Sequence, residues 1–171
     1  NRKLKKLKGV PKLSDAKFAG TPRAKECTLI CTEGDSAKTL ASSGLRVVGN
    51  DFYGVYPLRG KPLNLTDVSL KRMKENVEYE TLKKILGLNE GDNISNIDNM
   101  RYGKVMIMSD QDLDGFHIKL LFANIFRERF PELFLKHPGF ISSFVTPIVT
   151  ATPSGAKGTR DEQSQKIFFF S

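Results

Sequence analysis

The chain has 171 residues, of which 39% are hydrophobic and 27% charged, and its formal net charge is +8 at pH 7. That length and apolar content suit one domain of ordinary size with its own hydrophobic core. The sequence has no apolar run long enough to span a bilayer and no signal-peptide pattern, so it does not indicate a membrane protein. Because the chain begins with Asn rather than Met, we expect a soluble piece of a longer protein.

Positive charge is concentrated at the N-terminus. Residues 1–13, "NRKLKKLKGVPKL", carry six basic side chains and no acid, which leaves about +2 for the rest of the chain. Such an arm indicates a polyanionic partner, most simply nucleic acid. A solvated, partly disordered terminus is the simpler explanation of a lone charge run, and both interpretations stay open at this point.

The first half of the chain alternates strand and helix signals. "CTLIC" (27–31) predicts a buried strand on which Cys27 and Cys31 share a face. They would lie roughly 13 Å apart, too far for a disulfide, and no further zinc ligand is spaced nearby. We therefore expect two small core residues, which fits a reducing compartment. The next predicted elements are a helix from about Asp35 to Gly44, a strand over 51–58 and a helix over 67–88.

The second half continues the alternation. "KVMIM" (104–108) predicts a third strand, and apolar residues at three- and four-residue steps predict an amphipathic helix over 115–130, ended by Pro131. An extended segment (139–152), a flexible loop (153–165) and a closing strand (166–171) follow. This order favours an α/β fold with a mostly parallel central sheet flanked by helices. We expect a basic arm or linker (1–20), one domain (21–150), and a loop with a closing strand that leads to missing downstream domains (151–171).

Carboxylates follow two of the predicted strands. Glu33 comes after the first, and "SDQDLDG" places Asp110, Asp112 and Asp114 after the third. Parallel sheets collect functional sites at the carboxyl ends of their strands. Clustered carboxylates are costly to keep ionised unless a cation neutralises them, and oxygen ligands without a His or Cys cluster suit Mg²⁺. A capped helix start is the structural alternative, because Asp is favourable at a helix N-terminus.

Three other motifs fit less well. An EF-hand loop beginning at Asp110 would need Glu at its twelfth position, which is Leu121, and a helix in front of it. An aspartyl-phosphate phosphatase also begins with D-x-D after a strand, its first Asp being the nucleophile, but this chain has Asp114 where Thr or Val is usual. A P-loop is excluded, because the glycine spacing of "GVYPLRGKP" is one residue too long and Pro62 stands where Ser or Thr would bind magnesium.

Three stretches, "EGDSA" (33–37), "PLRGKPLNL" (57–65) and "SDQDLDGFHIK" (109–119), resemble in order and spacing the TOPRIM domain of type II DNA topoisomerases. "FVTPIV" (144–149) extends the resemblance, and the surroundings of the third stretch resemble the eukaryotic enzymes more than the bacterial gyrases. The resemblance covers the chain from about residue 10 to its end. It implies a Rossmann-like TOPRIM fold within an ATP-dependent, nuclear, homodimeric enzyme that cleaves and rejoins double-stranded DNA.

The resemblance also implies roles for individual residues. Glu33 and Asp110 would hold the catalytic Mg²⁺, for which Mn²⁺ or Ca²⁺ could substitute. Asp112 would be a further ligand at a second metal position, with Asp114 as nearby support. His117 would help near the leaving oxygen or make a structural hydrogen bond. DNA contacts are implied for Gly34, Asp35, Arg59, Lys61 and Asn64.

The chain lacks parts of a complete enzyme. The family's nucleophilic tyrosine lies in a separate domain, and we assign that role to no tyrosine here, including Tyr102 in "MRYGK". ATP would bind only in a domain absent here, so we expect this fragment to be inactive by itself and monomeric. The alternatives are a non-catalytic nucleic-acid-binding module and another TOPRIM enzyme, a primase or nuclease. The complete acidic set argues against the first, and "PLRGKPLNL" with "FVTPIV" against the second.

Overall fold

The computed structural model describes Leu7 and residues 9–33, 35–59, 75–89, 97–145, 149–151 and 166–168. Several predictions concern positions outside these ranges. They are the first part of the helix predicted over 67–88, the loop predicted over 153–165, and the predicted DNA contacts Gly34, Lys61 and Asn64.

The described elements alternate between strand and helix along the chain. In order they are the 3-10 helix η1 (Ala24–Glu26), β1 (Thr28–Thr32), α1 (Asp35–Val48), β2 (Tyr53–Pro57), α3 (Val77–Leu86), the 3-10 helix η2 (Ile97–Asn99), β3 (Lys104–Met108), α4 (Leu113–Arg129), α5 (Pro131–Lys136), β4 (Ile141–Ser143), β5 (Val149–Ala151) and β6 (Lys166–Phe168). None of these helices is both long and apolar enough to cross a membrane.

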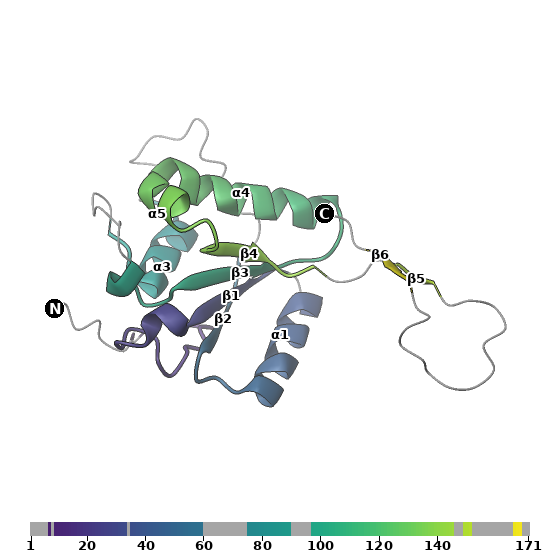
Figure 1. The fold of residues 1–171 in the computed structure, drawn as a ribbon, viewed down its shortest axis with the longest axis horizontal. Helices are drawn as coiled ribbons and strands as arrows, with labels where there is room; N and C mark the ends of the chain where they lie inside the picture. Colours follow the sequence, from purple (N-terminus) through teal and green to yellow (C-terminus); the bar gives the residue numbers. More distant parts are fainter. Residues whose placement is uncertain are drawn as a thin grey trace.

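Four of the strands form one parallel sheet in the order β2-β1-β3-β4, and β5 and β6 form a separate antiparallel pair. Helix α1 lies on one face of the four-stranded sheet, and α3 and α4 lie on the other (Figure 1). Parallel neighbours need crossover connections, and helices supply them here. The predicted α/β fold with a parallel sheet between helices is confirmed.

The core divides along the sheet because side chains of a strand alternate between its two faces. On the side of α3 and α4, Leu29 of β1 and Val105 of β3 pack against helix residues such as Phe122, and all three are 0% exposed. On the side of α1 a smaller cluster contains Ala37, Ala41, Val55 and Met108. Both cysteines are free and buried, as predicted.

Helix α1 ends later than predicted. We expected Gly44 to stop it, but the helix continues to Val48. Gly44 is exposed with open space around it, so it is tolerated in the helix interior. The residue that ends the helix is Gly49, whose φ of +80° is the left-handed conformation common after a helix C-terminus, and whose N–H donates to the Leu45 carbonyl oxygen at 2.9 Å. The correct stop signal was therefore the second glycine.

Residues 9–20, assigned above to a basic arm or linker, lie against the sheet. Ser14 forms an antiparallel bridge with Val55 of β2, and Ala16 and Ala19 are buried. The carboxylate of Asp15 pairs with the guanidinium of Arg101 and accepts a hydrogen bond from the hydroxyl of Tyr102. The packed unit therefore extends in front of the boundary predicted at residue 21.

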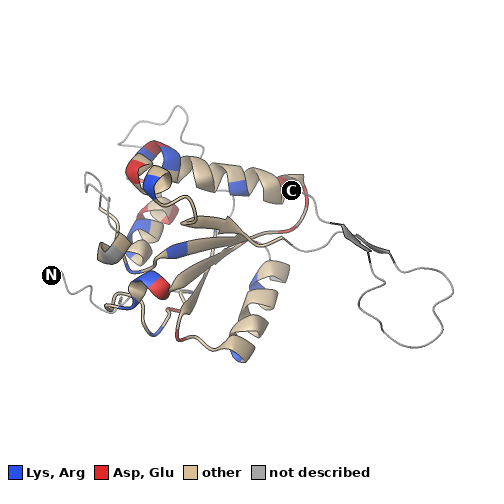
Figure 2. Cartoon of the chain, in the orientation of Figure 1, with Lys and Arg blue, Asp and Glu red and all other residues tan. Residues whose placement is uncertain are grey.

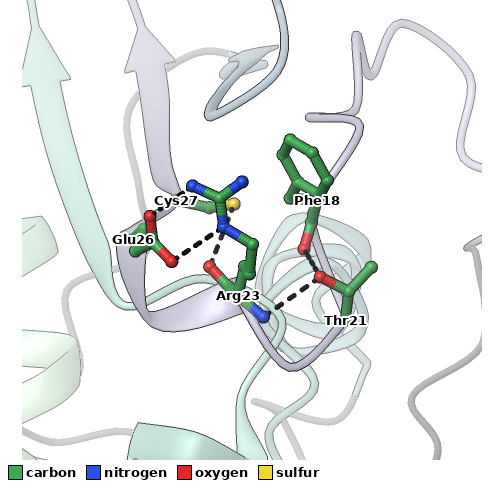
Figure 3. Close-up of polar contacts among 5 residues, drawn as sticks. All are labelled: Phe18, Thr21, Arg23, Glu26 and Cys27. Carbon is green, nitrogen blue, oxygen red and sulfur yellow. Dashed lines mark hydrogen bonds and ion pairs between the residues drawn. The ribbon is translucent and has the colours of Figure 1, made fainter.

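A turn before β1 is held by local polar contacts (Figure 3). Arg23 donates from Nε and Nη2 to the two carboxylate oxygens of Glu26, at 3.0 and 2.7 Å. The Thr21 hydroxyl donates to the Phe18 carbonyl oxygen and accepts from the Arg23 backbone N–H. The Arg23 guanidinium also lies over the rings of Phe18 and Phe52, at 4.6 and 4.4 Å from their centroids. These contacts fix the amino end of β1, opposite to the end that carries the carboxylates.

Candidate metal centre

Two acidic segments meet where β1 and β3 end. The two strands are parallel neighbours, with Thr32 opposite Met108 at their last paired position. One residue further, Glu33 donates its backbone N–H to the Met108 carbonyl oxygen at 2.9 Å, which extends the ladder into the connection. Asp110 lies two residues after the end of β3. The sheet therefore delivers Glu33 and Asp110 to the same edge, as the sequence predicted for a parallel sheet.

The loop between β3 and α4 is tightly built. Asp112 is the N-cap of α4, and its Oδ1 accepts from the Gly115 N–H at 2.7 Å. The Ser109 hydroxyl donates to the Gly115 carbonyl oxygen at 3.2 Å. A Cβ at position 115 would lie 2.0 Å from the backbone oxygen of Asp110, so only glycine fits this turn. These contacts hold Asp110 and Asp112 in one connection. The capped helix start, given above as the structural alternative, is present, with Asp112 as the cap.

Asp110 is exposed and lines a cavity of about 260 Å³. Helix α1 forms one wall with Ser36, Ala37 and Leu40, and the end of β3 with its loop forms the other with Met108, Ser109 and Gln111. Gln111 donates from Nε2 to the Phe144 carbonyl oxygen at 3.2 Å and accepts from the Lys119 ammonium at 3.4 Å. The loop is thus fastened to α4 and to the segment after β4.

The donors at this edge fit a hard divalent cation. Within the described ranges, no three His, Cys, Asp or Glu side chains gather into a ready-made metal cage. Mg²⁺ does not require one, because it commonly takes one or two carboxylates and completes its shell with waters and substrate phosphates. Glu33 and Asp110 place two carboxylates at the ends of adjacent strands. The Asp112 carboxylate already accepts the helix-capping hydrogen bond from Gly115 through its Oδ1 atom.

Comparison with known proteins places this arrangement in a family. A family model described as "Toprim domain" matches residues 28–143, which span β1 to β4 and both acidic segments. The chain belongs to the Toprim family. The matched region contains the four-stranded sheet and the helices on both of its faces.

Relatives of this Toprim chain are much longer proteins. It is 59% identical over 154 residues to "DNA topoisomerase 2" of Bombyx mori, covering 88% of this chain and 10% of the relative. It is 53% identical over 153 residues to "DNA topoisomerase 2-beta" of Homo sapiens, covering 88% of this chain and 9% of the relative. The chain therefore spans about a tenth of the length of these curated relatives.

A solved structure is similar to this Toprim chain over nearly its full length. It is the crystal structure of the Plasmodium falciparum topoisomerase II DNA-binding, cleavage and re-ligation domain, with a TM-score of 0.84 and 47% sequence identity. The match covers 97% of this chain and 22% of that chain. The resemblance predicted from the three sequence stretches is confirmed.

The other predicted site residues lie at different distances from this edge of the Toprim sheet. Asp114 lies in the first turn of α4, and Asp35 is the first residue of α1. Arg59 is exposed two residues after β2 and donates its backbone N–H to Glu78 at 3.3 Å. His117 is exposed on α4 and does not line the cavity that Asp110 lines. Its predicted role near a leaving oxygen stays a prediction.

The four tyrosines of the Toprim chain are poor candidates for a nucleophile. Tyr56, Tyr79 and Tyr102 are buried, and Tyr53 begins β2, at the end of the sheet away from the carboxylates. Burial and the neighbouring Asp15 carboxylate raise the pKa of Tyr102 far above its ordinary value, although the hydrogen bond that its hydroxyl accepts from the Ala16 N–H opposes the shift. Its hydroxyl is committed to structural contacts.

Sequence reasoning missed two residues that build this connection. Ser109 and Gln111 lie on either side of Asp110 and bond to Gly115 and to Phe144, respectively. A small polar residue after a strand and a glutamine in a loop carry no distinctive signal. Only the contacts across the fold reveal that they hold the acidic turn in place.

Proposed function

We propose that this chain is the Mg²⁺-binding Toprim domain of an ATP-dependent type II DNA topoisomerase, which supports cleavage and rejoining of double-stranded DNA by a tyrosine in another domain. The observation that carries the proposal is the register at the sheet edge, where Glu33 and Asp110 follow adjacent parallel strands. The names of the relatives and of the similar structure support the reaction class.

Different residues of this chain would have different roles in that function. Glu33 and Asp110 would hold the ion, with Asp112 contributing a carboxylate while it caps α4. When bound, a divalent ion supplies stabilisation of negative charge on the phosphate and the leaving oxygen. Arg59, at the carboxyl end of β2, adds positive charge for the DNA backbone at the same edge of the sheet. The loop contacts of Ser109, Gln111 and Gly115 keep the carboxylates in position.

The proposal extends to the intact protein. It would be a homodimer that hydrolyses ATP in another domain and acts in the nucleus, and the isolated chain would be a monomer without cleavage activity. The similarity to topoisomerase 2 proteins from insect, human and Plasmodium sources supports a type II topoisomerase as the intact protein. The homodimer, the ATP hydrolysis and the nuclear location come from the family resemblance alone. Sedimentation of the isolated chain tests the expected monomer, since a tight dimer would contradict it.

Plasmid cleavage by the intact protein tests the function. We expect Glu33→Gln and Asp110→Asn each to abolish DNA cleavage while DNA binding persists, because each removes a charged metal ligand without changing the size of the side chain. Glu132→Gln is the matched control, since Glu132 lies on α5 and forms an exposed pair with Lys136. Cleavage at the wild-type rate by either site variant would overturn the assignment.

A further inference from the structure

A basic groove lies between α1 and β2, apart from the acidic turn. Its volume is about 430 Å³. Three cations and three hydroxyl or amide side chains line it, namely Lys12, Lys38, Arg46, Ser14, Ser42 and Asn50. The described residues that form its wall include no Asp or Glu. Leu45, Val55 and Pro57 add an apolar part to the lining. The groove therefore offers a ligand positive charge and neutral hydrogen-bonding groups beside that apolar surface.

The three cations of the groove have no acidic partner in the described chain. All three are exposed, and none forms an ion pair with another described residue. Two other surface cations are paired, Lys17 with Asp51 and Lys136 with Glu132, so the groove is set apart by the gathering at one place of three cations that are unpaired within the described ranges. Figure 2 shows basic segments along α1, whereas the loop before α4 carries acidic ones. Like charges around one groove favour a bound polyanion.

The backbone holds Lys12 beside the groove in an unusual conformation. Its φ of +71° is the left-handed region, which no other non-glycine residue of the described ranges adopts. Such a conformation costs on the order of 1 kcal/mol and persists where neighbouring contacts fix it. Two residues later, Ser14 exchanges both backbone hydrogen bonds with Val55, at 2.9 and 2.8 Å. That antiparallel bridge sets Lys12 beside Pro57 at the carboxyl end of β2.

The groove begins at the edge of the sheet that carries the candidate metal centre. Pro57 lines the groove and lies two residues before Arg59. Lys38 lies in the first turns of α1, next to Ala37, which lines the cavity of Asp110. Arg46 lies near the other end of α1. A polyanion at the metal centre could therefore continue along α1 and meet the three cations in turn.

We infer that the basic groove binds the phosphodiester backbone of duplex DNA and leads it away from the metal centre, an inference that rests on the proposed function. Strand β2, with five residues, spans roughly 16 Å. Over that length one strand of duplex DNA carries about five phosphates, enough for each cation to meet a separate one. Ser and Asn side chains commonly donate to phosphate oxygens, and such contacts position DNA without reading its sequence.

The test measures binding of a short fluorescent duplex to the 171-residue chain. Fluorescence anisotropy gives the affinity at a series of salt concentrations, in buffer that contains EDTA. We expect the variant Lys12→Gln, Lys38→Gln, Arg46→Gln to bind on the order of a thousandfold more weakly at about 50 mM salt, with the difference shrinking as the salt concentration rises. The plot of log K against log salt concentration has a negative slope, and its magnitude should decrease by about 0.9 per lost contact, hence by about 2.7 for the three. Lys38→Gln alone should lower it by about 0.9 and avoids any effect on the Lys12 turn.

The matched control is Lys25→Gln, Lys84→Gln, Lys104→Gln, which removes the same charge from exposed positions outside the groove. Its slope should stay close to that of the wild type. Equal slopes for the groove and control variants would overturn the inference, as would a wild type that does not bind the duplex. The inference would also be overturned if the wild type bound polyglutamate, the groove variant did not, and neither bound the duplex. The ligand of the groove would then be an acidic protein segment. Because EDTA removes divalent ions, these outcomes are independent of metal binding, which tests the proposed function separately.

Discussion

The backbone N–H of Glu33 donates to the carbonyl oxygen of Met108 at 2.9 Å, one step beyond the last paired residues of β1 and β3. This bond joins two segments that lie about 75 positions apart in the chain. It fixes the register between the segments that follow β1 and β3, and so the backbone positions of Glu33 and Asp110. The relation between Glu33 and Asp110 is thus set by backbone pairing. Substituting either side chain should therefore change the chemistry of the edge and leave the sheet intact.

Gly115→Ala should destabilise the acidic turn. The added methyl group would lie 2.0 Å from the Asp110 carbonyl oxygen and 2.9 Å from the Ser109 hydroxyl oxygen, so the loop must shift. We expect a loss of about 1–3 kcal/mol in the free energy of unfolding, measured by urea denaturation. Metal affinity should fall as well, because the displaced backbone belongs to Asp110.

Gly44→Ala is the matched control for that substitution. Gly44 also lies in a helix, but open space surrounds it. Alanine should therefore stabilise the chain by about 0.5–1 kcal/mol through helix propensity. An equal effect of both substitutions would show that the close approach at Gly115 has no energetic consequence.

Asp15→Asn should destabilise the fold through a buried ion pair. The Arg101 side chain is 2% exposed, and its guanidinium contacts the Asp15 carboxylate and donates to the Ile85 carbonyl oxygen at 3.1 Å. Removing the carboxylate charge leaves a buried cation poorly compensated, which costs roughly 3 kcal/mol or more. Thermal or urea unfolding measures the loss.

Asp51→Asn provides the comparison for this prediction. Asp51 pairs with Lys17 at 3.5 Å, and both side chains are more than half exposed. The expected change in the free energy of unfolding is within about 1 kcal/mol. If Asp15→Asn were equally mild, the network around Arg101 would be incidental to stability.

Alkaline pH should weaken the fold through its buried thiols. Burial raises the pKa of Cys27 to about 11 and raises that of Cys31 further. An unfolded thiol loses its proton near pH 9, so between about pH 9 and 11 the unfolded chain binds fewer protons than the folded chain. The free energy of unfolding should therefore be fully retained below pH 9 and fall as the pH rises through this window.

Urea denaturation at several pH values measures the effect. The double variant Cys27→Ala, Cys31→Ala should be less stable overall, because it loses buried volume, but its stability should depend less steeply on pH above 9. A slope as steep as that of the wild type would assign the alkaline loss to other groups. Tyr56 is the next candidate, since burial raises its pKa to about 12.

The parts of the fold that were predicted correctly have strong local patterns. The strand over 104–108 is bounded by Gly103 and the aspartates, and it matches β3 residue for residue. The apolar steps of α4 place Ile118, Phe122 and Ile125 in the core. Gly44 misled the prediction because two glycines lie near the end of α1, and the sequence does not show which one adopts a positive φ.

The candidate site was predictable in composition but not in construction. The acidic run predicted a cation site, with a capped helix start as the structural alternative, and the Asp112 cap shows that the alternative is also present. The register that brings Glu33 beside the end of β3 depends on pairing across the sheet, which local sequence does not encode. The basic groove was missed for the same reason, because Lys12 reaches α1 only through the bridge between Ser14 and Val55.

Titration of this chain with Mn²⁺, monitored by electron paramagnetic resonance, tests most directly whether Asp110 belongs to a metal centre. The proteins compared are the wild type, Asp110→Asn and the control Glu132→Gln, each with and without a short nicked duplex. We expect the wild type and the control to bind Mn²⁺ and Asp110→Asn to lose this binding. The duplex should strengthen the binding, because its phosphates complete the coordination shell. Equal Mn²⁺ binding by all three proteins, with the duplex present, would show that the acidic turn is structural and would contradict the assignment of the metal centre.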